Sequence, residues 1–226
     1  MDDRVAGWLL ALAIGASLVF IAGREERPHA VGAVALLVLY VVALAIASWL
    51  LGGAWRALAP AIAAGAVWLA VQPLLALGRL RRDEIGLVPP RPGSVGPAIA
   101  VTAVALVAHG LVLIARGADP VPVSAALVVA VVVAALVEEL VMRGVILALA
   151  DRAAPPRWTL YGASIGIGGL VVTAAFIALH GLRPGLLLGV VPAAMLYLWL
   201  RARTGSLLPP MVAHLLWNLS VVLLHR

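Results

Sequence analysis

Two adjacent glutamates and an arginine, Glu138, Glu139 and Arg143, lie in a stretch that is otherwise apolar enough to cross a membrane. A charge at bilayer depth costs roughly 2.5 to 3.5 kcal/mol on insertion scales, so such residues are usually functional. Glu139 and Arg143 are four residues apart, which places them on one helix face, and we expect them to form an ion pair. Glu138 points about 100° away from that face and has no partner within its helix. It is therefore free to act as a general base.

Two further apolar stretches carry polar residues at the same spacing. Phe176 and His180 are four residues apart, and so are His214 and Asn218. Each pair therefore shares a helix face. A carboxylate, two imidazoles and an amide are the groups that water activation and oxyanion stabilisation require. An isolated buried histidine more often serves packing, and His109 is interpreted in that way.

The composition predicts that membrane-spanning helices position these groups. The chain of 226 residues is 64% hydrophobic and 12% charged, whereas soluble domains have roughly 45 to 50% and 25%. A spanning helix needs about 20 apolar residues. We expect an all-α, polytopic transmembrane helical bundle that forms a single domain over residues 1–226, with N-terminal helices and a cytoplasmic loop in 1–118. About eight spans are predicted: Val5 to Ala22, Ala30 to Leu51, Leu58 to Leu77, Pro97 to Ile114, Val121 to Ala150, Leu160 to His180, Pro184 to Leu200 and Ser206 to Leu224.

The charged and sulfur-containing residues narrow the possible functions. No cysteine occurs, which excludes a disulfide, a thiolate metal site and a cysteine nucleophile. The net charge of +6 comes from 16 arginines without lysine, and basic loops facing anionic lipid explain it without nucleic acid. With eight spans, the side with more arginines is cytoplasmic and both termini are external. That side carries Arg24, Arg27, Arg79, Arg81, Arg82, Arg91, Arg152, Arg157, Arg201 and Arg203, and the other carries Arg4, Arg56, Arg116, Arg183 and Arg226.

The sequence also predicts the conformation of two segments, one between the third and fourth spans and one at the start of the sixth. Residues 79–97 are the long polar connection, for which we expect a cytoplasmic position and a short interfacial helix before an extended stretch. In the sixth span, a straight helix from Leu160 would place His180 about 30 Å deep, whereas Glu138 and His214 lie only about 15 to 18 Å from their cytoplasmic ends. We therefore expect residues 158–169 to be surface-lying or broken. The site should then occupy a cavity open toward the cytoplasm.

Three short motifs resemble those of a known family. EELVMR at 138–143, FIALH at 176–180 and HLLWN at 214–218 match the patterns EExxxR, FxxxH and HxxxN. In this order they resemble the motifs of the CAAX prenyl protease and bacteriocin-processing family, also called the Abi family, which includes the Ras-converting CAAX endopeptidase. The resemblance covers roughly Pro120 to Leu224 and makes residues 119–226 the catalytic core.

The resemblance implies an intramembrane endopeptidase with a membrane-associated substrate, prenylated or not. The absence of lysine and the high alanine content indicate a GC-rich bacterial or archaeal genome, so we expect a prokaryotic plasma membrane with its lipids as partners. A monomer of eight helices can build the site alone. The implied roles are water activation by Glu138 and His180, oxyanion stabilisation by His214 and Asn218, and structural support by Glu139, Arg143 and Phe176.

The family has been interpreted both as zinc proteases and as glutamate proteases without a metal. The sequence lacks HExxH. A zinc site of Glu138, His180 and His214 would leave no separate base unless Glu139 served. We therefore favour the reaction without a metal and keep zinc as the alternative.

Two other functions remain open. A proton-coupled transporter also uses buried glutamate, arginine and histidine, but it usually shows inverted repeats, and the first half of this chain has almost no buried charge. A non-proteolytic scaffold or bacteriocin-immunity protein of the same fold is the other alternative, because a fold does not by itself establish catalysis.

Overall fold

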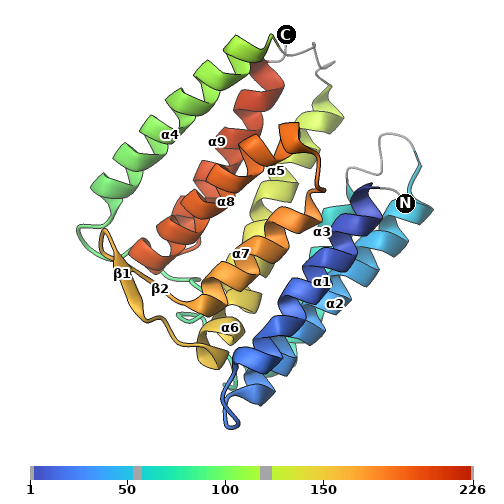
Figure 1. The fold of residues 1–226 in the computed structure, drawn as a ribbon, viewed down its shortest axis with the longest axis vertical. Coiled ribbons are helices and arrows are strands. Elements are labelled where there is room, and N and C mark those ends of the chain that lie inside the picture. Colours follow the sequence, from blue (N-terminus) through green and yellow to red (C-terminus); the bar gives the residue numbers. More distant parts are fainter. Residues whose placement is uncertain (1–2, 53–57, 118–123, 225–226) are drawn as a thin grey trace.

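The computed structural model describes residues 3–52, 58–117 and 124–224, which form an all-α bundle with one short β-hairpin (Figure 1). The elements are α1 (Asp3–Ile21), α2 (Arg27–Leu50), α3 (Ala59–Ala76), α4 (Val95–Arg116), α5 (Ala125–Glu139), the π-helix η2 (Leu140–Ile146), α6 (Leu147–Ala153), β1 (Trp158–Leu160), β2 (Ala163–Ile165), α7 (Ile167–Leu179), α8 (Pro184–Thr204) and α9 (Leu208–Leu224). Arg56, Arg226, the predicted start of the fifth span at Val121, Pro120 and the boundary at residues 118 and 119 lie outside the described residues.

Apolar helices of spanning length dominate the described chain. Within the described residues, α1, α2, α3, α4 and α8 are long and apolar enough to cross a membrane, whereas α7 and α9 are apolar but shorter, with 13 and 17 residues. The helices α5, η2 and α6 follow one another directly and act as one long helix. The chain is therefore a multi-pass membrane protein. The prediction of eight crossings goes beyond these five helices and remains a prediction.

The long α5–η2–α6 helix lies inside the bundle (Figure 1). It packs against α2 and α3 on one side and against α9 on another, while α6 and η2 also contact α7. The helices α1 to α3 therefore cover one side of the motif-bearing helices, and α4 covers the other side through contacts with α8 and α9. This arrangement encloses all three motifs.

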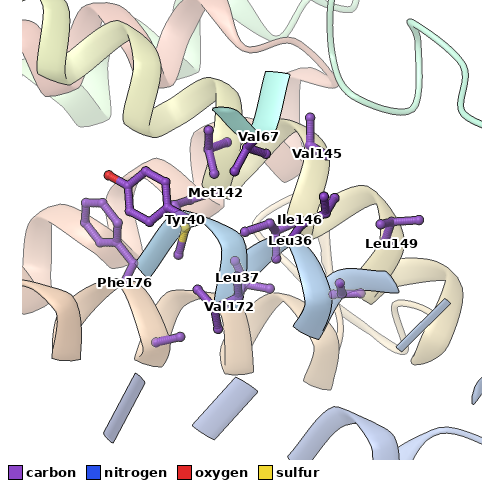
Figure 2. Packing of buried hydrophobic residues seen from close by; sticks show 14 of the residues in the cluster. Leu36, Leu37, Tyr40, Val67, Met142, Val145, Ile146, Leu149, Val172 and Phe176 are labelled. Atoms are coloured by element: carbon purple, nitrogen blue, oxygen red, sulfur yellow. The ribbon is translucent and has the colours of Figure 1, made fainter. Parts of the chain in front are cut away.

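The core between these layers is built from aliphatic side chains and close helix contacts. Lipid is as apolar as leucine, so helices in a bilayer associate through tight packing of small residues. Gly7 of α1 shows this, because a Cβ there would overlap the carbonyl oxygen of Ala178 in α7. Figure 2 shows residues of α2, η2 and α7 meeting in this core, among them Leu36, Leu37, Tyr40, Met142, Ile146, Val172 and Phe176.

The segment before α7 is broken, as the depth argument required. Residues 158–160 and 163–165 form an antiparallel hairpin in which Trp158 lies opposite Ile165. Its turn residues, Tyr161 and Gly162, have φ of 46° and 75°, and a two-residue turn of this kind needs positive φ at both positions. The helix begins only at Ile167, so the predicted span from Leu160 is wrong at its start, and the predicted break in 158–169 is confirmed. His180 consequently lies about 20 Å along its helix.

The connection between α3 and α4 contains no helix. Residues 77–94 are turns and bends, so the predicted interfacial helix in 79–97 is wrong. The segment folds back onto the bundle. Leu80 and Ile85 are buried, the carbonyl of Gly86 accepts a hydrogen bond from the N–H of Leu207, and Arg152 binds the Glu84 carboxylate. These contacts hold the connection against α6 and the start of α9.

Candidate active site

Glu139 and Arg143 form the predicted ion pair at the centre of the bundle. Arg143 Nη1 lies 3.6 Å from Glu139 Oε1, and the two side chains are 1% and 0% exposed. Arg143 Nη2 donates to the carbonyl of Ala194 in α8, 3.2 Å away. His214 Nδ1 lies 3.0 Å from Glu139 Oε1. One carboxylate therefore joins α5 to η2 and α9, and its arginine reaches α8.

Arg143 lies in the π-helical segment, which the sequence did not predict. Single π turns are rare and often mark functional sites. Arg201 of α8 donates from Nε to the carbonyl of Arg143, 3.1 Å away, and from Nη2 to the carbonyl of Glu84, 2.6 Å away. Arg201 therefore ties η2 to α8 and to the connection between α3 and α4.

Glu138 is one residue away and has different surroundings. Its side chain is 13% exposed, and its Oε2 lies 3.9 Å from Nε2 of His180 and 3.9 Å from Nε2 of His214. These residues come from α5, from the end of α7 and from α9. The structure thus brings together three of the residues that the sequence singled out. A separation of 3.9 Å is too long for a direct hydrogen bond and is wide enough for a bridging water.

The partners of the two histidines fix how their rings are oriented. His180 Nδ1 lies 2.9 Å from the carbonyl oxygen of Phe176, and since a carbonyl only accepts, Nδ1 must donate. His214 Nδ1 donates in the same way to the Glu139 carboxylate. In their neutral forms, both histidines therefore direct an Nε2 lone pair toward Glu138. A water can donate to these acceptors, and a proton can be shared among them.

Aromatic rings hold these groups in place. The Arg143 guanidinium lies 4.0 Å from the centre of the Phe176 ring, a cation–π contact. Tyr197 of α8 stacks on His214 with 4.7 Å between ring centres and 20° between the planes. The sequence reasoning missed Tyr197. The sequence does contain a sign of this residue. The chain has only three tyrosines, and a tyrosine hydroxyl in the middle of an apolar helix needs a polar neighbour.

A large cavity of about 600 Å³ begins at these residues. Glu138, His180 and His214 line it, and so does Asn218, one turn beyond His214. The rest of the wall is mainly apolar and comes from α4, α5, α8 and α9. His109 also lies in this wall, where its ring stacks on Trp217 at 4.0 Å. The stacking on Trp217 agrees with the interpretation of His109 as a packing residue. Its position in the cavity wall was not predicted.

The cavity reaches one end of the bundle. Its wall continues to Arg116 at the end of α4 and to Gly185 at the start of α8. This is the end where the two chain termini lie (Figure 1). The sequence predicted that the termini are external and that the site opens toward the cytoplasm. Those two predictions cannot both hold, because the termini and the cavity are at the same end.

The three groups that a zinc ion would need are spread widely. With bonds of about 2.0 to 2.1 Å, neighbouring tetrahedral ligands lie about 3.3 Å apart, whereas both histidine nitrogens are 3.9 Å from Glu138 Oε2. In the part of the chain that the structure describes, no group of three acidic, histidine or cysteine residues is placed to hold a metal. The residues as positioned do not fit the ion, and no step is assigned to it.

The chain also resembles a known protein family. Residues 120–220 match the family described as Type II CAAX prenyl endopeptidase Rce1-like. The matched part contains all three motifs and with them Glu138, His180 and His214. Comparisons with curated proteins and with solved structures give no match.

Proposed function

We propose that the chain is an intramembrane endopeptidase, because residues 120–220 match the Rce1-like family of type II CAAX prenyl endopeptidases. The single observation that carries this proposal is the meeting of Glu138, His180 and His214 at the inner end of a largely apolar cavity. Hydrolysis needs a base, a water and an oxyanion donor within a few ångströms of one another. A packing cluster would have no need of the cavity.

The geometry supports a division of work between the two histidines. A water between Glu138 and His180 attacks the scissile carbonyl carbon, and its proton passes to the Glu138 carboxylate. The oxyanion then forms near His214 and Asn218. In its protonated form, His214 can donate from Nε2, and the Glu139 carboxylate at Nδ1 stabilises that imidazolium. The C–N bond breaks as Glu138 returns the proton to the leaving amine.

The cavity wall suggests a substrate with a long apolar group. Side chains such as Leu113, Val131 and Leu186 line it between the catalytic end and the mouth, and an apolar wall favours an apolar ligand. A membrane-associated peptide carrying a lipid, such as a prenylated CAAX-type peptide, fits this wall. The polar backbone of that peptide would reach the carboxylate and histidines at the inner end.

We also propose that the cavity mouth faces the cytoplasm of a prokaryotic cell, so that both termini are cytoplasmic. The arginine count argued for the reverse orientation. However, Arg91, Arg152 and Arg201 at the other end donate hydrogen bonds to backbone carbonyls. These arginines therefore stabilise the fold, and their number does not depend on membrane orientation alone. Labelling of Arg116→Cys in intact cells tests this orientation, because the chain has no other cysteine. Protection from an impermeant reagent is expected, and labelling from outside would overturn it.

Cleavage of a quenched fluorescent farnesylated CAAX peptide by purified protein in detergent tests the activity. We expect the wild type to cleave it and Glu138→Ala to lose cleavage while remaining folded. A chelator should leave the wild-type rate unchanged, since the proposed reaction does not use zinc. Equal cleavage by both proteins would remove Glu138 from the mechanism. No cleavage of prenylated or unmodified membrane peptides would favour a scaffold or immunity protein.

A further inference from the structure

A second, smaller cavity of about 120 Å³ lies behind Glu138 and His180. Only three residues, Glu138, Phe176 and His180, line both cavities within the described chain. The remaining wall of the smaller cavity comes from α2, α3, η2 and the end of α7, through Tyr40, Leu44, Pro60, Met142 and Leu179. The base and its histidine therefore form a partition between two spaces of different size and lining.

The smaller cavity has the size and the polar groups to hold water. One water occupies about 30 Å³ of liquid, so 120 Å³ has room for several waters. A buried water needs two to four polar partners. The side chains of Tyr40, Glu138 and His180 provide them, and the other lining side chains are apolar.

Tyr40 is the one of these three residues that belongs to neither the motifs nor the matched region. Its side chain is 3% exposed, and its ring lies beside that of Phe176, away from Leu36 and Leu37 (Figure 2). A buried tyrosine hydroxyl normally has a hydrogen-bond partner. No described residue forms a hydrogen bond with this hydroxyl, and the cavity is the space that it lines.

We propose that the smaller cavity is the water chamber of the site and that the Tyr40 hydroxyl positions the attacking water between Glu138 and His180. This inference rests on the proposed peptidase activity. A substrate in the large apolar cavity displaces the water there, so the nucleophile must come from another space. Water in the small chamber reaches the same carboxylate from behind. Its oxygen bonds to the carbonyl carbon, its proton moves to Glu138, and the Tyr40 hydroxyl keeps its own proton throughout.

With Tyr40 at the attacking water, the N-terminal half of the chain takes part in catalysis. Tyr40 and Leu44 come from α2, and Pro60 comes from α3, and all three lie outside residues 120–220. These helices then do more than enclose the motif-bearing helices. They close the chamber and contribute one polar group to the reacting water.

Tyr40→Phe removes the hydroxyl and keeps the ring. We expect kcat for peptide cleavage to fall about tenfold, the loss that one hydrogen bond of average strength accounts for. KM and the melting temperature should stay as in the wild type, because the substrate cavity and the core are unchanged. Tyr161→Phe is the matched control, since Tyr161 is 85% exposed at the hairpin turn. An unchanged kcat in Tyr40→Phe would overturn the role of Tyr40.

The chamber itself is tested without reference to activity. The chain has no cysteine, so Leu44→Cys and Leu37→Cys each carry a single thiol. A small methanethiosulfonate reagent reacts with the thiolate, which forms only where water reaches it. We expect Leu44→Cys to react at least tenfold faster than Leu37→Cys, because Leu37 is buried in the dry core. Equal, slow reaction of both would overturn the water chamber. The labelling rates test the water chamber even if the wild type cleaves no peptide. Absence of cleavage would count only against the proposed peptidase activity.

Discussion

The regions around Glu138 and Glu139 differ although the residues are neighbours in the chain. Glu139 is fully buried and contacts an arginine and a histidine within 3.6 Å. Glu138 faces two cavities, and the Nε2 atoms of two imidazoles lie 3.9 Å from its carboxylate. The helix turns about 100° between them, which is enough to place one carboxylate in a closed network and the other at a reaction space.

The difference shows how one helix serves both stability and chemistry. A buried charge is tolerated when its partners satisfy it, and those partners then hold it in one position. A carboxylate that lacks a direct partner can accept a proton from a substrate or from water. The closed region around Glu139 therefore stabilises the fold, while the open region around Glu138 acts on the reactants.

The largest effect is expected from breaking the closed region with Arg143→Met. The substitution leaves the Glu139 charge buried without its cation, which typically costs about 3 to 5 kcal/mol. Unfolding in detergent, followed by helical signal against denaturant, measures this loss. Arg183→Met is the matched control, because Arg183 pairs with Asp3 at the surface with side chains 77% and 56% exposed. Equal losses for both variants would show that the buried pair has no special role.

Asn218→Ala acts on the open region and comes next. We expect kcat to fall about 10²- to 10³-fold, the usual result of removing an oxyanion donor. The melting temperature should change little, since Asn218 faces the cavity. Ser220→Ala, two residues further along α9, removes only a hydrogen bond to the carbonyl of Trp217 and should keep normal activity. A small loss in Asn218→Ala would assign the oxyanion to His214 alone.

Arg201→Lys tests the hydrogen bonds that fix η2, and with it the positions of Glu138 and Glu139, relative to α8. Lysine cannot reproduce the two directed bonds of the guanidinium to the carbonyls of Arg143 and Glu84. We expect kcat to fall about tenfold with KM unchanged, as Glu138 moves slightly from its histidines. Arg82→Lys, in the exposed part of the connection, is the control. Full activity in Arg201→Lys would mean that η2 keeps its geometry without this tie.

Outside both regions, we expect a pH dependence of stability at the arginine-rich end. Asp151 lies beyond the predicted span that ends at Ala150, where burial raises the pKa of its carboxyl from 3.8 to about 7, against the opposing effect of Arg201. Between these values the folded state binds the proton and the unfolded state does not, so stability falls as pH rises from about 4 to about 7. Melting temperatures from pH 4 to 8 should show a flatter curve for Asp151→Asn. Identical curves would contradict the burial of an ionisable carboxyl.

Local patterns in the sequence predicted what depends on local spacing. The apolar runs gave the helices, and the i,i+4 spacing gave the Glu139–Arg143 pair. Comparing helix depths showed that the chain must break before α7. Each of these features follows from the rise or the rotation of a single helix.

Features that depend on contacts between distant segments could not be predicted. Tyr40 and Tyr197 reach the site from helices with no motif, and the π turn at η2 has no propensity signal. Residues 79–97 look like an amphipathic surface segment, but Glu84 is bound by Arg152, 68 positions further along the chain. The end at which the cavity opens depends on how α4, α8 and α9 pack, and amino-acid composition does not predict that packing.

A direct comparison of Glu138→Gln with Glu139→Gln tests the central claim that the two carboxylates have separate roles. Both substitutions keep the shape of the side chain and remove the charge. Cleavage of the farnesylated peptide and the melting temperature would be measured on the same preparations. We predict that Glu138→Gln loses cleavage and keeps its melting temperature, whereas Glu139→Gln lowers the melting temperature. Loss of stability in Glu138→Gln, with full cleavage retained, would contradict the account.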